Sequence, residues 1–210
     1  MTDPDRVAAH FTRGDGAFLF ARWERRPAPV IFGTDEAGTE VFGQALADAC
    51  ALAGLETAAE DPELGANFMV FFCTEWPELK AVPHLAKLIP DLEKLVSVLA
   101  GSGANQYRIF GFDEAGAIRI ALVLLRYDED LRKVSAATLA LSQSVQSLLL
   151  WSDRAFEAES PLAFTDEGVA VKPWHAALLK AAYDPVLPAR SEDASFSLRL
   201  AARMREIEGG

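Results

Sequence analysis

The sequence predicts an α/β fold of the α+β kind, with a mixed, twisted sheet of about four or five strands, a central buried helix and a helical C-terminal part. One observation is Val134–Ser152, which has no charged residue in a chain that is 24% charged and whose apolar residues recur at helical spacing. A helix that is apolar on several sides has to be packed on several sides. The other is Asn67–Thr74, a continuous apolar run typical of a strand buried on both faces.

The first part of the chain predicts half of a strand–helix–strand crossover. The aromatic run Gly14–Trp23 indicates a strand or an extended lead-in, and Val30–Phe32 indicates a second short strand. Thr34 or Asp35 can then cap a helix over Glu36–Leu52, which Gly54 would end. A further short strand is expected at Leu55–Ala59.

The middle of the chain predicts helical segments followed by a hairpin. Apolar residues keep helical spacing over Leu85–Leu99 across Pro90, which indicates one kinked helix or two short helices in line. The segments Gln106–Phe112 and Ala117–Arg126 have strand character, and Asp113–Gly116 between them suits a hairpin connection.

The C-terminal part is predicted to be mostly helical. After an irregular polar segment, Asp153–Gly168, Pro173 opens a helix that Asp184 and Pro185 close, and Ser191–Ile207 forms a last helix. We expect a single domain over residues 1–210, with a lead-in at 1–15 and the C-terminal helix at 190–210.

The composition bears on partners and location. A net charge of -11 and a pI of about 4.7 disfavour nucleic acid and anionic membrane surfaces. The uncharged stretch has too many hydroxyls and amides for a membrane span, and the N-terminal residues do not have the pattern of a signal peptide, so a cytoplasmic protein is expected. Cys50 and Cys73 are expected to be buried, reduced thiols.

The order of the predicted elements resembles the zincin metallopeptidase scaffold. It is more closely similar to a bacterial domain family of unknown function that looks like a degenerate zincin, and the resemblance spans about Phe18 to Pro188. Four segments carry it: Arg22–Trp23 with Pro29–Phe32, Asn67–Phe72, Leu141–Val145 and Leu178–Leu187.

The zincin motif H-E-x-x-H would fall on the central helix, where two histidines bind zinc and the glutamate polarises a water. In the register that the resemblance implies, Leu139 and Gln143 occupy the ligand positions and Ala140 the position of the base. None of these residues can perform its role. The resemblance therefore implies a pseudoenzyme with a zincin-like fold, no metal and no cofactor.

Few other residues could support catalysis. His10, His84 and His175 lie in separate segments, so a shared metal site is not expected, and His175 alone could act as a general base with Asp184 or Asp166. Its simpler interpretation is a packed histidine at a helix start. Ser102 lies in a loop and not in a nucleophile elbow. The acidic run 128–130 could hold a hard cation or cap the central helix.

Three hypotheses about function follow. The first is a non-catalytic protein that binds a protein or peptide through the remnant cleft or the sheet edge at Gln106–Phe112, because zincins hold substrate as an added strand. The second is a metal-independent hydrolase that uses His175 with a nearby carboxylate. The third is a homo-oligomer whose role depends on its neighbours.

Overall fold

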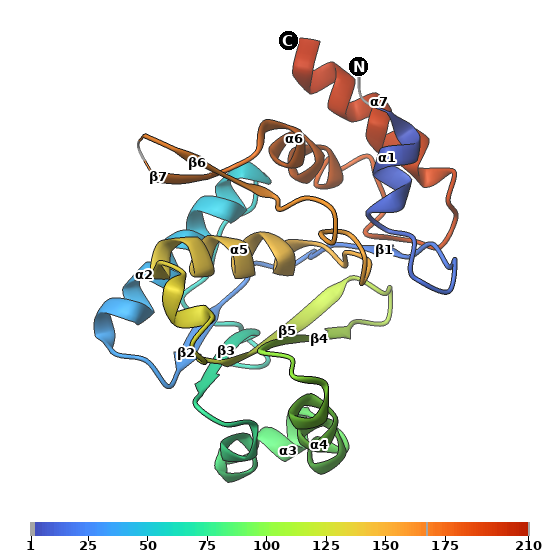
Figure 1. Cartoon of the computed structure of the whole chain (residues 1–210). Helices are drawn as coiled ribbons and strands as arrows, with labels where there is room; N and C mark the ends of the chain where they lie inside the picture. Colours follow the sequence, from blue (N-terminus) through green and yellow to red (C-terminus); the bar gives the residue numbers. More distant parts are fainter. Residues whose placement is uncertain (1–2, 167, 210) are drawn as a thin grey trace.

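The computed structural model describes residues 3–166 and 168–209, and it contains the predicted mixed sheet. Its strand order is β2-β3-β5-β4, where β2, β3 and β5 are parallel and β4 runs antiparallel to β5 at one edge. Helices lie above and below this sheet (Figure 1). The α/β fold class is therefore confirmed. The strands are β2 (Pro29–Phe32), β3 (Phe68–Cys73), β4 (Gln106–Phe112) and β5 (Ile118–Arg126).

The crossover from β2 to β3 runs through α2 (Glu36–Leu52), which has the predicted bounds. Of the two candidate caps, Asp35 is the one used, because its carboxylate accepts a hydrogen bond from Gly38 N at 2.8 Å. After the helix, Gly54 adopts a φ of +72°, a left-handed conformation that glycine tolerates best.

The central helix is α5 (Ala136–Leu148), which lies next to α2 on the upper face of the sheet (Figure 1). It is shorter than predicted. Leu149 has extended backbone angles, and Leu150 N donates to Ala21 O at 2.9 Å. The last residues of the uncharged stretch therefore leave the helix, because their backbone bonds to residues near the N-terminus, such as Ala21.

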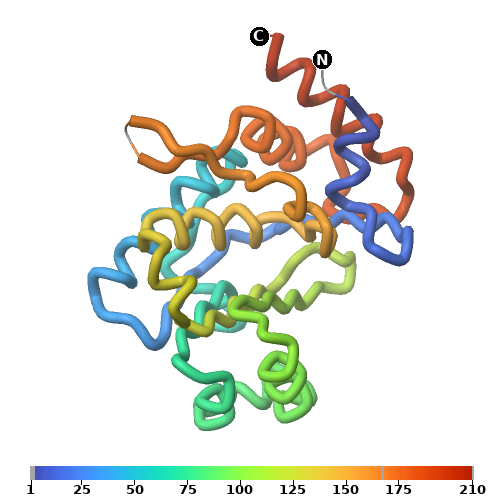
Figure 2. The backbone as a smooth tube through the Cα atoms, viewed as in Figure 1, coloured from blue at the N-terminus to red at the C-terminus, as the bar shows by residue number. Residues whose placement is uncertain are grey.

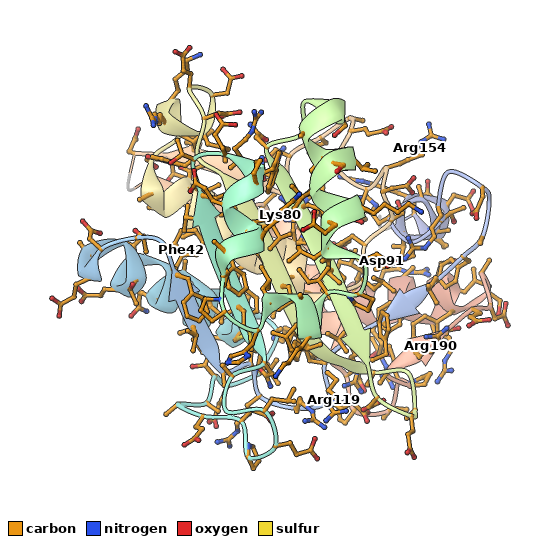
Figure 3. All side chains as sticks on the ribbon, turned by 90° about the horizontal axis from the view of Figure 1, so that it is seen from below. Phe42, Lys80, Asp91, Arg119, Arg154 and Arg190 are labelled. Carbon is orange, nitrogen blue, oxygen red and sulfur yellow. The ribbon has the colours of Figure 1, made fainter. Side chains whose placement is uncertain are left out.

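The lower face of the sheet is covered by η1 (Trp76–Ala81), α3 (Leu85–Leu88) and α4 (Leu92–Ser102), as Figure 3 shows from below. The apolar spacing across Pro90 thus belongs to two helices. Alternate residues of β3 and β5 face two separate cores, so β3 is buried on both faces as predicted. Val70, Ala121 and Val123 belong to the upper core; Phe71, Leu122 and Leu124 belong to the lower core.

The first and last helices lie side by side, since α1 (Pro4–Ala9) contacts α7 (Phe196–Gly209) (Figure 2). The lead-in therefore contains a short helix that the sequence analysis did not expect. β1 (Phe20–Ala21) pairs with β8 (Arg190–Ser191), so the last helix begins after the predicted Ser191. The helix opened by Pro173 is α6 (Pro173–Ala182), as predicted.

Two further predictions about local structure were wrong. Residues 55–59 form no strand, and Ala58 N donates to Pro27 O at 2.9 Å, outside the sheet. The segment predicted to be irregular contains β6 (Leu162–Thr165), which pairs with β7 (Gly168–Val171). Within the described residues, no helix combines the length and the apolar composition that a membrane span requires.

Candidate functional site

The predicted motif positions on α5 are buried and make no catalytic arrangement. Leu139 and Ala140 belong to the upper core, where Ala140 is fully buried. Gln143 is also fully buried, and its amide bonds two residues of the edge strand β4. The helix therefore joins β4 through an amide, which has neither the acid–base capacity nor the metal affinity of the histidine in H-E-x-x-H.

Strand β4 leaves one row of backbone groups free. Arg126 N donates to Asn105 O at 2.9 Å just before β4 begins, so these two residues form a hydrogen-bonded pair. The antiparallel alternation then directs the N–H and C=O of Tyr107 and Ile109 toward β5 and those of the intervening residues outward. In the described chain no strand pairs with this outer side. The residues whose backbone N–H and C=O point outward are Gln106, Arg108 and Phe110.

A cavity of about 580 Å³ borders β4 on the side of α5. Its wall on the far side is formed by Trp151 and Phe156, which follow the helix. Two cations, Arg13 and Arg108, line it together with Asp153, whose carboxylate accepts a hydrogen bond from Gly14 N at 3.1 Å. The cavity and the free edge of β4 together form a groove.

Arg108 is the charged group at the floor of this groove, and its described hydrogen-bond partners are neutral. Its guanidinium donates to Gln143 Oε1 at 2.5 Å and to the amide oxygen of Gln146. A second hydrogen bond orients each amide, because Gln143 Nε2 donates to Gln106 Oε1 at 2.6 Å and Gln146 Nε2 donates to Ser142 Oγ at 2.8 Å. Removal from water lowers the pKa of Arg108 to about 10.

No ion pair to Arg108 occurs among residues 3–166 and 168–209. The charge is thus stabilised in the described residues by two amide dipoles and by no carboxylate. A half-buried guanidinium with unused N–H donors is a strong binding group for a carboxylate or phosphate.

A second, smaller cavity of about 380 Å³ borders β4 on the opposite face, beside α4. Its walls are mainly apolar, with Leu95 and Val98 from the helix and Tyr107 and Ile109 from the strand. Val98 is 57% exposed and Tyr107 is 41% exposed, so this surface is open to a ligand.

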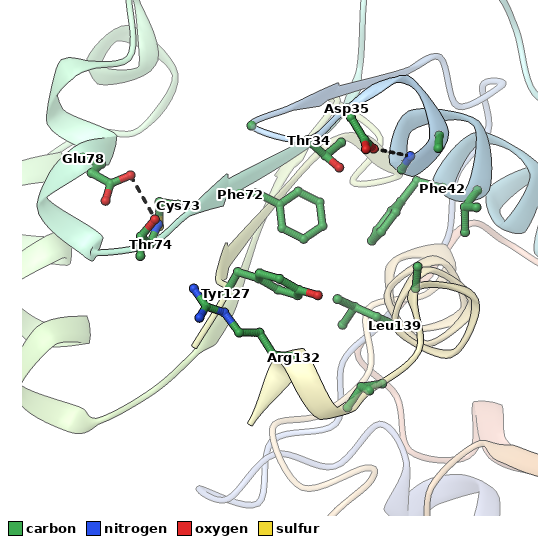
Figure 4. A pocket seen from close by; sticks show the side chains of 16 residues that line it. Thr34, Asp35, Phe42, Phe72, Cys73, Thr74, Glu78, Tyr127, Arg132 and Leu139 are labelled. Carbon is green, nitrogen blue, oxygen red and sulfur yellow. Dashed lines mark hydrogen bonds between the residues drawn. The ribbon is translucent and has the colours of Figure 1, made fainter. Parts of the chain in front are cut away.

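A third cavity, about 670 Å³, lies where β2, β3 and β5 end and α2 begins (Figure 4). Open α/β sheets commonly bind ligands at this end of their parallel strands. Figure 4 shows Phe42, Phe72, Tyr127 and Leu139 pointing into it. Arg132, in the short helix η2 (Leu131–Lys133), places its guanidinium carbon 5.8 Å from the centroid of the Tyr127 ring.

The acids of this cavity serve the local backbone. Asp35 caps α2, and Glu78 accepts hydrogen bonds from Thr74 N at 3.3 Å and Glu75 N at 2.9 Å (Figure 4). The cavity is therefore an aromatic recess whose carboxylates have structural partners.

His175 lies in an aromatic cluster behind the groove wall. Its ring is fully buried, and neither nitrogen has a hydrogen-bond partner. The His10 ring lies 5.5 Å from it between centroids, and His10 Nδ1 is 2.8 Å from Arg6 O. Burial, with the charge of His10 second, lowers the pKa of His175 to about 4.

The predicted partners of His175 lie elsewhere. Asp184 forms an ion pair with Arg203 at 3.2 Å, and Asp166 is exposed in the turn after β6. The predicted base–carboxylate pair is therefore not formed, and a fully buried imidazole has no surface at which to meet a substrate. The packed-histidine interpretation describes this residue better.

The remaining candidates have structural roles. His84 is exposed with a φ of +64° and has no ring contact with the His10–His175 pair in the described residues. Asp128 accepts hydrogen bonds from Leu131 N at 3.0 Å and Asp130 N at 3.1 Å at the start of η2, whereas α5 is capped by Ser135. Cys50 and Cys73 are free and buried, as predicted. The described residues contain no group of three or more metal-ligating side chains.

Sequence reasoning pointed to β4 but did not single out the side chain of Arg108, which the structure places at the floor of the groove. The available signal was the alternation of Gln106, Arg108 and Phe110 on one face of a predicted strand, together with a central helix whose polar positions are amides and hydroxyls. The chain matches no family model, no curated protein and no solved structure, so the assignment depends on this geometry.

Proposed function

We propose that this protein is a non-catalytic binding protein that takes up an extended peptide segment as an additional strand beside β4. The observation that carries the proposal is the free outer edge of β4, bordered by a cavity on each face of the sheet. Strand addition gives affinity through backbone hydrogen bonds, and flanking cavities accommodate alternate side chains.

The proposed resemblance to a degenerate zincin is consistent with this function. In that scaffold the edge strand holds the substrate, and backbone pairing does not require a metal. In this chain, Leu139 and Gln143 stand at the proposed ligand positions and Ala140 at that of the base, so we propose binding without hydrolysis.

The test uses a library of synthetic peptides with alternating side chains, with binding measured by fluorescence anisotropy. Phe110→Pro removes one outward N–H while leaving the ladder to β5 intact, because proline is tolerated at an open edge. Phe110→Ala is the matched control, since it shortens the same side chain and keeps the N–H. We expect Phe110→Pro to abolish the binding of peptides that still bind Phe110→Ala.

Amide hydrogen exchange supplies a readout that does not depend on variants. In the free protein the amides of Tyr107 and Ile109 should exchange slowly and those of Arg108 and Phe110 rapidly. A bound peptide should protect Arg108 and Phe110. Peptide binding with no added protection at these two amides would show that the ligand lies elsewhere and would refute strand addition.

A further inference from the structure

The two cavities beside β4 differ in chemistry, and this difference bears on which peptide the proposed function would select. In an added strand, successive side chains point to opposite faces of the sheet. One set would enter the cavity next to α5, where Arg108 and Arg13 lie, and the other set would enter the cavity next to α4. Each set therefore meets a different surface.

On the α5 face, the surface next to β4 is suited to a carboxylate. Gln143 and Gln146 fix the Arg108 guanidinium in place, so little side-chain entropy remains to be lost on binding. Arg13 also has no ion pair in the described residues, whereas the acid Glu157 in this cavity is paired with Arg154 at 3.3 Å. Asp153, whose carboxylate also lines this cavity, offsets one of the two cations, so one positive charge remains for an incoming anion.

On the α4 face, the surface is suited to an aliphatic side chain. Leu95, Val98 and Ile109 form an apolar wall, and Val98 is among the most exposed large apolar residues of the described chain. A branched side chain from an added strand would cover this wall and remove apolar area from water.

We infer that the partner of β4 is an extended segment in which a carboxylate side chain, bound by Arg108, is flanked by aliphatic side chains that cover the wall at Val98. The inference rests on the proposed function, because it requires that the segment pair with β4. It adds the identity of the selected side chains and assigns Arg108 as the specificity-determining residue.

The experiment uses two nine-residue peptides, Thr-Val-Thr-Val-Glu-Val-Thr-Val-Thr and its analogue with Gln in place of Glu. We expect the wild-type protein to bind the Glu peptide about tenfold more tightly, the scale of one charge-assisted pair. Arg108→Gln should remove this preference and still bind both peptides. Val98→Asp should weaken both peptides to a similar extent, because it acts on the opposite face of the strand.

The outcomes separate the two proposals. Equal binding of the Glu and Gln peptides by wild type, with binding lost in Phe110→Pro, would refute the carboxylate preference and leave strand addition standing. Binding unaffected by Phe110→Pro would refute strand addition itself. If neither peptide binds, both proposals fail, since the peptides supply every feature that the two surfaces require. Circular dichroism of each variant verifies that it is folded.

Discussion

At the scale of single residues, the contact between Arg108 and Gln143 places a charge that suits binding at a cost to the stability of the fold. Gln143 is fully buried and needs its hydrogen bonds, while Arg108 loses part of its hydration without gaining a carboxylate. Gln143 and Gln146 accept its hydrogen bonds but supply no countercharge. The unpaired charge therefore has the character of a binding group.

This opposition predicts a measurable coupling. Arg108→Met removes a desolvated charge but leaves Gln143 without a donor, whereas Gln143→Met leaves the guanidinium with one acceptor fewer. The double variant should cost less than the sum of the single variants, with a coupling free energy of about 1–2 kcal/mol from urea unfolding. The exposed pair Arg26–Glu56 is the control and should show much weaker coupling. Additive costs at Arg108 and Gln143 would contradict the contact.

The buried His175 predicts how stability depends on pH. Its pKa is about 4 in the folded protein, compared with 6.5 ordinarily, so its neutral form is favoured. Above pH 6.5 the imidazole is neutral in both states. As pH falls from 6.5 toward 4, the unfolded chain binds a proton that the folded chain does not, so the free energy of unfolding falls by up to about 3 kcal/mol.

Comparison of variants isolates this contribution from that of the carboxylates. Urea unfolding of His175→Leu should show a weaker pH dependence between 6.5 and 4, and the part that remains belongs to groups such as His10, whose pKa is also lowered by burial. His84→Asn, at an exposed left-handed position that asparagine tolerates, should keep the wild-type curve. Identical curves for wild type and His175→Leu would show that the ring does not titrate in this range.

At the scale of elements, the turn from β2 into α2 depends on Gly33. Its φ is +81°, and a Cβ atom would lie 2.3 Å from Phe72 O. Gly33→Ala should therefore lower the free energy of unfolding by about 2–3 kcal/mol. Gly43, inside α2, has no atom within 4 Å of a Cβ, so Gly43→Ala should raise stability by about 0.5–1 kcal/mol. A thermal unfolding series that ranks both variants alike would contradict this account of the turn.

Elements were predictable from the sequence where a local signal and burial agreed. The helix over Glu36–Leu52 had a cap, an apolar stripe and a terminating glycine, and the strand over 106–112 had a hairpin turn after it. The β6–β7 hairpin was missed because its alternation is short and Phe164 on it is 79% exposed. The end of α5 was missed because Leu149–Ser152 has no charged residue, like the helix before it, although its backbone bonds to Ala21 and His10.

The candidate site was less predictable than the fold. The edge position of Gln106–Phe112 followed from the hairpin and the order of elements, but the contact between Arg108 and α5 depends on residues 35 or more positions apart. His175 was singled out by its type and neighbours, and its pairing with Asp184 required a tertiary contact that does not form. Local pattern carries no information on such distant pairs.

At the scale of the whole molecule, an open sheet edge creates a risk of association with a second copy. If two copies paired their β4 strands antiparallel through all three outward residues, Gln106 of one copy would lie opposite Phe110 of the other. Arg108 would then lie opposite Arg108. Like charges directly opposite are destabilising, and each copy carries a net charge of -11. The charge that we assign to binding would thus also oppose self-pairing.

The last prediction follows from this dual role of Arg108. Wild-type protein should sediment as a 22.8 kDa monomer at physiological salt. Arg108→Val removes the opposed charges and adds a residue that favours strands, so it should shift the protein toward a dimer. Phe110→Pro placed in the same chain should restore the monomer, because it blocks the outward N–H that a second copy would need. A wild-type dimer that Phe110→Pro dissociates would show that the edge is already occupied by a second copy, and the peptide would then have to displace it.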